Sequence, residues 1–180
     1  FVIDRYVASC DAQNANRNAG IAALESVIEF VLNQVSTEVF DVDKAFHGTK
    51  RLDPLQIWAV SHGLAFADCY HTLLIDGVNS DDNTLSTLMT VFETNEHMKT
   101  LEICRANIGK KTFQVLSSSL ALNSKCALNE LNIIDCHLDK VMLQLLTPAF
   151  NCIQLRTIRI TNCFLNNKVE QTKKILYMYI

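Results

Sequence analysis

The chain has 180 residues, of which 49% are hydrophobic and 19% are charged, and its formal net charge at pH 7 is −3. This balance is typical of globular proteins, and it argues against a disordered chain or a strongly basic nucleic-acid-binding surface. The longest apolar runs fall far short of the roughly 20 residues that a membrane-spanning helix needs. We therefore expect a globular chain with a substantial core and no membrane span.

The first 34 residues predict a helical segment ahead of the main architecture. Its apolar side chains recur at the three- and four-residue spacing of one helix face, at Ile21, Leu24, Val27, Ile28 and Val31. We assign residues 1–34 to an N-terminal helical cap or linker. It would cover the first edge strand, whose backbone and core would otherwise be exposed.

A repeated apolar pattern dominates the rest of the sequence. Four copies are centred on Leu73, Leu101, Leu131 and Ile158, which are 28, 30 and 27 residues apart. This period is close to the upper end of leucine-rich repeats, about 20–29 residues. A weaker copy centred on Phe40 lies 33 residues upstream of Leu73, as expected of an irregular terminal repeat.

Each copy predicts a short strand, a turn and a helix. Alternation with period two places Leu101 and Ile103 on the inner face of a strand, and helical spacing follows at Phe113, Leu116 and Leu120. The sequence therefore predicts an α/β fold, a leucine-rich-repeat solenoid of the ribonuclease-inhibitor type with parallel strands on a concave face and helices on a convex face. We assign it to residues 35–180 and expect it to be incomplete at the C-terminus.

The outward strand positions form the candidate surface for binding a partner protein, because the concave wall of such solenoids is a usual recognition site. Its charge is mixed, which favours specificity over raw affinity. A solvated spacer that only separates neighbouring domains is the alternative. The candidate residues are Leu74, Asp76, Glu102, Cys104, Arg105, Glu130, Asn132, Asp135, Arg159 and Thr161.

No pattern of residues predicts catalysis, a cofactor or a metal. The chain has five histidines and seven cysteines but no close ligand pair, and Cys136 and Cys163 are expected to be small buried residues in the turns. The odd number of cysteines favours a reducing, cytoplasmic environment over a disulfide framework. Residues 48–50 lack the glycine spacing of a phosphate loop, and the serines at 117–119 lie in a predicted helix with no histidine nearby in the sequence. Asp81 and Asp82 are expected to begin a helix.

Three segments resemble the CARMIL family of cytoskeletal proteins, which bind and inhibit actin capping protein. They are residues 5–11 (RYVASCD), 39–47 (VFDVDKAFH) and 52–60 (LDPLQIWAV), and Cys69 and Tyr70 then lead into the first full repeat. The resemblance covers nearly the whole chain.

The resemblance implies a multidomain, non-enzymatic scaffold that regulates capping protein and actin assembly at the cell cortex. It implies a membrane-associating domain before this region, so that contact with the plasma membrane would be indirect. Capping protein would be bound by a disordered tail outside these 180 residues, and dimerisation would use a region beyond them. Because the basic residues are scattered, neither nucleic acid nor an anionic membrane is expected as a direct ligand.

A second class is also compatible with the repeats, namely a cytosolic partner-binding module of the ribonuclease-inhibitor or immune-receptor kind. The chain starts at Phe1 and ends in the unbalanced run at 173–180, so we expect it to be a fragment of a longer protein.

Overall fold

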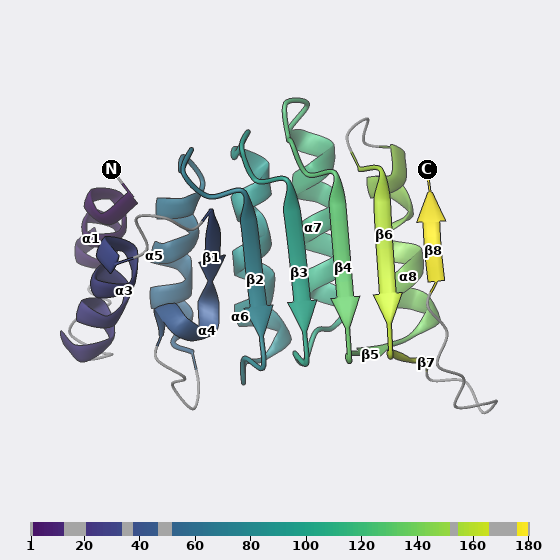
Figure 1. Cartoon of the computed structure of the whole chain (residues 1–180), viewed down its shortest axis with the longest axis horizontal. Helices are drawn as coiled ribbons and strands as arrows, with labels where there is room; N and C mark the ends of the chain where they lie inside the picture. Colours follow the sequence, from purple (N-terminus) through teal and green to yellow (C-terminus); the bar gives the residue numbers. More distant parts are fainter. Residues whose placement is uncertain are drawn as a thin grey trace.

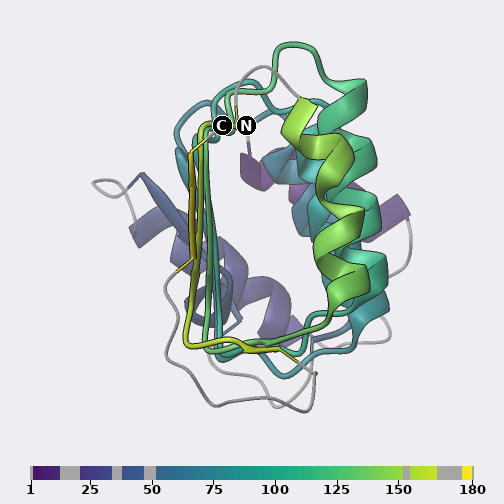
Figure 2. The ribbon, with the colours of Figure 1, turned by 90° about the vertical axis from the view of Figure 1, so that its right-hand side faces the viewer.

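The computed structural model describes residues 2–12, 21–33, 38–46, 52–151, 155–165 and 176–179. It has two layers, a sheet and a row of helices that covers one face of the sheet. The strands lie side by side along the long axis of the molecule, and so do the helices (Figures 1 and 2). Five strands run parallel in the order β1, β2, β3, β4 and β6, and β8 adds an antiparallel strand at the far edge. The fold is therefore α/β with a parallel sheet, as predicted.

The main strands are β1 (Val39–Asp41), β2 (Thr72–Asp76), β3 (Thr100–Cys104), β4 (Glu130–Ile134), β6 (Thr157–Thr161) and β8 (Leu176–Tyr179). A separate parallel pair consists of β5 (His137–Leu138) and β7 (Phe164–Leu165). The helices are α1 (Val2–Ala12), α3 (Ile21–Asn33), α4 (Val42–Ala45), α5 (Pro54–Leu64), α6 (Asp82–Leu88), α7 (Lys110–Leu122) and α8 (Lys140–Leu145). Two 3-10 helices, η1 (Met89–Glu93) and η2 (Thr147–Asn151), follow α6 and α8.

The strands pair in the register that the apolar pattern predicts. Leu73 lies opposite Leu101, Leu101 opposite Leu131, and Leu131 opposite Ile158. All four side chains are fully buried beneath the helices, together with a second row of isoleucines two residues later. Because successive strand residues point to opposite faces, the residues between these rows face away from the helices.

The turn after each full strand recurs with the spacing of the strands. Gly77, Arg105, Asp135 and Asn162 all have positive φ, at 65°, 49°, 53° and 53°. The N–H of Gly77 donates to the carbonyl of Cys104, and the N–H of Arg105 donates to the carbonyl of Ile134. These bonds continue the pairing of neighbouring strands into the turns.

The first unit departs from the prediction. Phe40 pairs with Leu73 as expected, but Val42 begins the short helix α4 instead of extending the strand. Asp41 stops the strand there, since its carboxylate accepts a hydrogen bond of 3.2 Å from the backbone N–H of Lys44 and so caps α4. Strand β8 was also not predicted by the repeat pattern.

Two helices lie beside the first strand. The predicted helix is α3, and a second helix, α1, packs against α5. Phe30 of α3 makes an edge-to-face contact with Phe40 at 5.3 Å between ring centroids, and Phe40 makes the same contact with Tyr70. Tyr6 and Cys10 of α1 are buried, so this end of the core is continuous with the rest.

The helix starts also recur. Asp53, Asp81 and Asp139 precede α5, α6 and α8, and each carboxylate accepts a backbone N–H of the helix that it caps. Gly109 occupies the equivalent position before α7, but it has no side chain that could cap the helix. Asp82 of the preceding unit supplies the carboxylate instead, and it accepts hydrogen bonds from the backbone N–H of Gly109, Lys111 and Thr112.

Two asparagines tie the ends of consecutive units together. Asn95 is 1% exposed and donates to the carbonyls of Leu64 and Ala67 at 2.8 and 2.9 Å. Asn123, 28 residues later, donates to the carbonyls of Phe92 and Asn95, both at 3.0 Å. The units that end in Asn95 and Asn123 are thus each anchored to the unit before them.

Candidate functional site

The face of the sheet away from the helices is left uncovered by the described residues (Figure 2). Three rows of side chains cross it, because the strands pair residue by residue. The central row runs from Asp41 of β1 through Leu74, Glu102 and Asn132 to Arg159 of β6. We call this surface the open face.

The ten predicted residues are distributed between this face and the turns at its end. Eight of them lie at outward positions of the strands: Leu74, Asp76, Glu102, Cys104, Glu130, Asn132, Arg159 and Thr161. Arg105 and Asp135 do not lie on strands, because each occupies the left-handed turn that follows one.

Cys104 and Asn132 are not the exposed positions that the sequence predicted. Each is only 8% exposed. Both side chains are short and lie in interior strands, between longer neighbours on both sides. The surface that a partner could touch is therefore formed mainly by the neighbours of these two residues.

Ion pairs connect adjacent strands and turns on this face. The guanidinium of Arg105 donates to Asp76 Oδ2 at 2.6 Å, and that of Arg159 donates to Glu130. These exposed pairs are each worth about 0–1 kcal/mol, so their main effect is to orient the side chains. Sequence spacing alone did not pair them.

A third pair lies at the start of the strands and was missed by the sequence prediction. His71 Nδ1 is 2.7 Å from the carboxylate of Glu38, and this hydrogen bond, followed by the charge of a protonated His71, lowers the pKa of Glu38. The two residues immediately precede β2 and β1, in neighbouring units. Their equivalent places ahead of two paired strands were the only sequence signal.

Two acceptors lie opposite each other at the centre of the open face, on Glu102 and Asn132, and a third lies at the end of β2, on Asp76. Asn132 Oδ1 and Asp76 Oδ1 are buried and have no hydrogen-bond partner. The carboxylate of Glu102, directly opposite Asn132, accepts a weak hydrogen bond from the Cys104 thiol at 3.6 Å. Burial raises the pKa of that thiol to about 12, and the nearby Glu102 carboxylate adds to the rise.

Of the two cysteines in the turns, Cys136 is buried as predicted, whereas Cys163 is only partly buried. The thiol of Cys136 donates to the carbonyls of Ile103 and Ile134, and that of Cys163 to those of Ile133 and Thr161. Burial raises the pKa of both thiols, and a thiol with a raised pKa is a poor nucleophile at neutral pH.

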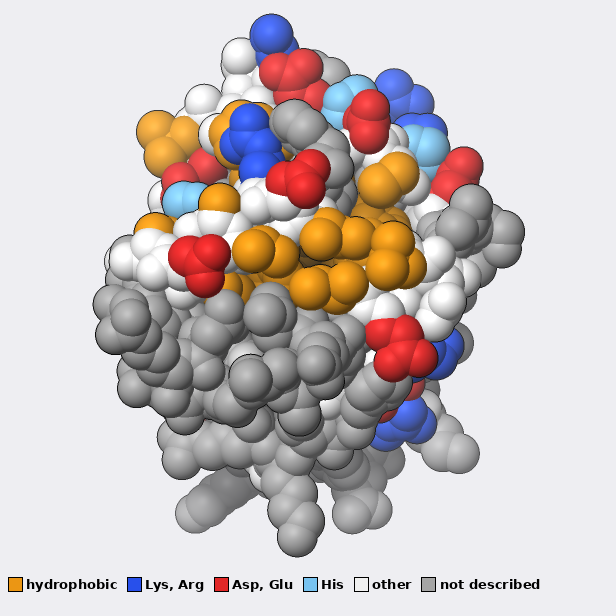
Figure 3. Space-filling view, turned by 90° about the vertical axis from the view of Figure 1, so that its left-hand side faces the viewer, with side chains coloured by type: hydrophobic (Ala, Val, Ile, Leu, Met, Phe, Trp, Pro, Cys, Tyr) orange, Lys and Arg blue, Asp and Glu red, His pale blue; other side chains and the backbone are white. Residues whose placement is uncertain are grey.

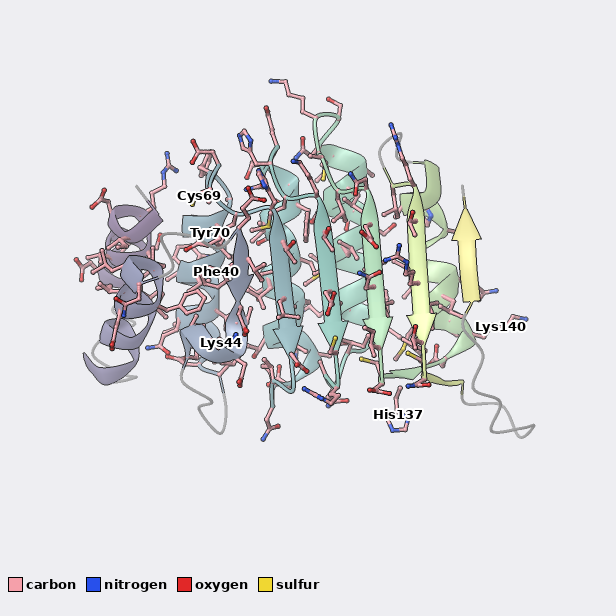
Figure 4. All side chains as sticks on the ribbon, in the orientation of Figure 1. Phe40, Lys44, Cys69, Tyr70, His137 and Lys140 are labelled. Atoms are coloured by element: carbon pink, nitrogen blue, oxygen red, sulfur yellow. The ribbon has the colours of Figure 1, made fainter. Side chains whose placement is uncertain are left out.

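The histidines and cysteines that the structure describes form no metal-binding group. Cys69 and His137 lie at opposite ends of the strands (Figure 4). In the ranges that the structure describes, no three His, Cys, Asp or Glu side chains are arranged to hold a metal ion. His47, Cys152 and the segment 48–50 lie outside those ranges.

The serines at 117–119 lie in α7 as predicted, and two of them have intramolecular partners. Ser118 donates to the carbonyl of Gln114 at 2.6 Å, and Ser119 to the carboxylate of Glu93 at 3.4 Å. Neither is next to a histidine in these contacts, so they do not form a nucleophile and base pair.

None of the helices in the described ranges combines the length and apolar character that crossing a bilayer requires.

The N-terminal end of the molecule carries a cluster of hydrophobic side chains on its surface (Figure 3). Figure 3, viewed from the side of α1 and α3, shows hydrophobic side chains gathered next to residues that are not described. Leu32 of α3 is 60% exposed, and a small pocket is lined by Ile3, Tyr6, Val27, Val31, Phe40, Val60 and Leu64. Burial raises the pKa of Tyr6.

Comparison with known proteins adds no family assignment. No protein-family model matches the chain, and no curated protein matches it.

Proposed function

We propose that the chain is a leucine-rich-repeat solenoid and serves as a non-enzymatic scaffold for protein interactions. The observation that carries this proposal is the repetition of strand, left-handed turn, capped helix and asparagine anchor with one common spacing. A unit of this kind cannot bury its own apolar face, so it is stable only when stacked on its neighbours. Such stacking leaves one face of the sheet free for a partner.

The more specific part of the proposal is that the protein is a CARMIL-type regulator of actin capping protein at the cell cortex. It rests on the resemblance of residues 5–11, 39–47 and 52–60. In support, the described parts of these segments gather at one end of the sheet, where α1 packs on α5 and Phe40 contacts Tyr70. The segments would thus form the irregular start of the solenoid, and the capping-protein-binding tail would lie outside the 180 residues.

An actin assembly assay tests the regulator proposal. Purified actin is polymerised with capping protein, and either the 180-residue chain or the longer natural protein is added. We expect the longer protein to relieve capping and the 180 residues alone to have no effect. A longer protein that leaves capping unchanged contradicts the regulator proposal, while a nucleotide-binding module upstream of this region would favour the immune-receptor class.

Blocking variants test the open face itself. Thr100→Arg and Thr157→Arg place long side chains on β3 and β6, on the face away from the helices. Gln114→Arg on the exposed side of α7 is the matched control, since it adds the same charge. We expect the two strand variants to reduce recovery of partners by the longer protein, and unchanged recovery would favour a spacer.

A further inference from the structure

An acceptor without a hydrogen-bond partner lies next to a carboxylate without a cation at the centre of the open face, within the described residues. Glu102 lies in β3, the middle strand of the five parallel ones, and its side chain is half-buried. Within the described chain, the other strand carboxylates of this face each have a cation: Asp41 pairs with Lys44, Asp76 with Arg105, and Glu130 with Arg159. Glu102 has none among these residues.

Asn132 provides an independent second observation. It lies directly opposite Glu102 on β4, is more than nine-tenths buried, and its Oδ1 has no hydrogen-bond partner. Asp76 Oδ1, at the end of β2 opposite Cys104, is also buried without a partner. The nearest cations do not satisfy these atoms, because Arg105 is bonded to Asp76 Oδ2 and Arg159 to Glu130.

A buried acceptor without a donor is unfavourable, and an acceptor that is ionised is more so. A group that satisfies this site must bring several N–H donors and a positive charge. A guanidinium has five donors in a planar fork and no acceptor, so it matches a carboxylate with an amide oxygen beside it. A phosphate would bring further acceptors and negative charge to a site that already contains a carboxylate and an acceptor without a donor.

We propose that Glu102 and Asn132 form a recognition site for an arginine side chain of the partner protein. This inference rests on the proposed use of the open face for binding. Glu102 supplies the charge and two carboxylate acceptors, and Asn132 supplies the neighbouring oxygen. The Glu130–Arg159 and Asp76–Arg105 pairs flank the site and leave its centre for the incoming group.

The probe is the peptide acetyl-Gly-Arg-Gly-amide, titrated into the ¹⁵N-labelled chain and followed by the backbone amide resonances. We expect the amides of Glu102 and Asn132 to shift, and Glu102→Gln to weaken binding at least about tenfold. Glu96→Gln is the matched control, because it removes the same charge from an exposed residue paired with Lys125 away from the strands. Asn132→Leu, which removes the orphan oxygen and retains similar size, is expected to weaken binding several-fold.

A peptide with neutral citrulline in place of arginine distinguishes charge recognition from nonspecific contact. Shifts of the same size with citrulline, equal binding by Glu102→Gln, or no shift of the Glu102 and Asn132 amides would overturn the proposal. Recovery of partners separates this failure from that of the proposed function. If Thr100→Arg loses the partners while Glu102→Gln keeps them, the open face binds but without this site, whereas full recovery with both variants contradicts the use of the face itself.

Discussion

The carboxylate of Asp82, at the start of α6, accepts a hydrogen bond of 2.8 Å from the backbone N–H of Gly109, the residue that precedes α7. The same carboxylate accepts from Lys111 and Thr112, so one side chain caps the helix of the next unit. A β carbon on Gly109 would overlap this carboxylate. The glycine is therefore required for contact rather than for backbone freedom, since its φ of −133° is open to any residue.

Gly109→Ala should lower the free energy of unfolding by about 2 kcal/mol, because the added methyl displaces the capping carboxylate. Urea denaturation of four proteins measures the effect: the parent, Gly109→Ala, Asp82→Ala and the double variant. In the Asp82→Ala background the same glycine substitution should cost about 1 kcal/mol less. Strict additivity would mean that the two residues do not interact.

The stability that Asp82 contributes should depend on pH. Burial alone would raise the pKa of Asp82, but the hydrogen bonds from Thr112, Lys111 and Gly109 together lower it. The ionised group therefore stabilises the fold above its unfolded-state pKa of about 3.9, and this contribution is lost as the pH falls through the lower folded-state value.

Unfolding of the parent and of Asp82→Asn, measured from neutral pH down to about pH 3, tests this dependence. The difference between them should be constant well above about pH 4 and should shrink below it. A difference that remains unchanged across the acidic range would contradict the assigned role of the charge.

Asn95→Ala should be among the most destabilising single changes. Besides its two donor bonds, Asn95 Oδ1 accepts from the backbone N–H of His97 and Met98 at 2.8 and 2.7 Å. The substitution removes all four bonds, of which those with Leu64, Ala67 and Met98 are buried, and we expect a loss of about 3 kcal/mol or more. Thermal unfolding compared with Asn107→Ala, an exposed asparagine, measures it; equal midpoints would disprove the anchoring role.

Substitutions of Gly77 test the left-handed turn, because an added β carbon would not disturb the packing. Its φ is +65°, and an added β carbon would have no neighbour within 4 Å. Gly77→Ala should therefore cost about 1 kcal/mol through backbone strain alone. Gly77→Asn should cost less, because asparagine tolerates this region and Asn162 already adopts it at the same place in a later unit. Chemical denaturation in which Gly77→Ala is as stable as Gly77→Asn, or more stable, would contradict this account.

Leu131→Ala should cost about 2–5 kcal/mol, because Leu131 is fully buried between Leu101 and Ile158 in the inner row. Gln114→Ala, on the exposed side of α7, is the control and should stay within about 0.5 kcal/mol of the parent. Thermal melts compare the two variants. A melt of Leu131→Ala that matches the control would mean that the strand register is wrong.

The sequence predicted the buried sides of the strands and of α7 well, and the reason is physical. A strand with one buried face must place an apolar residue at every second position, and the spacing of Leu73, Leu101 and Leu131 reports directly on which residues pair. The helix α7 was equally readable, because Phe113 and Leu116 repeat on its buried side.

The open face, the helix caps and the turns depend on contacts between units, which the spacing of apolar residues does not encode. Cys104 and Asn132 have the correct strand parity, yet their exposure is decided by longer side chains on neighbouring strands. Asp82 was expected only at the start of its own helix, whereas its partners lie 27 or more residues away in the sequence. The left-handed φ of Arg105 could not be inferred from a residue type that rarely adopts it.

The bonds of Asp82 and Asn123 hold both ends of α7 to the preceding unit, and this has a consequence for how the protein opens. A segment held only by apolar contact could detach alone, and its amides would exchange with solvent independently. Here, release of α7 breaks a helix cap at one end and two side-chain bonds to carbonyls at the other. Amide hydrogen exchange in β2 and β3 should therefore report one shared opening free energy, and a protease should cut across both units or neither.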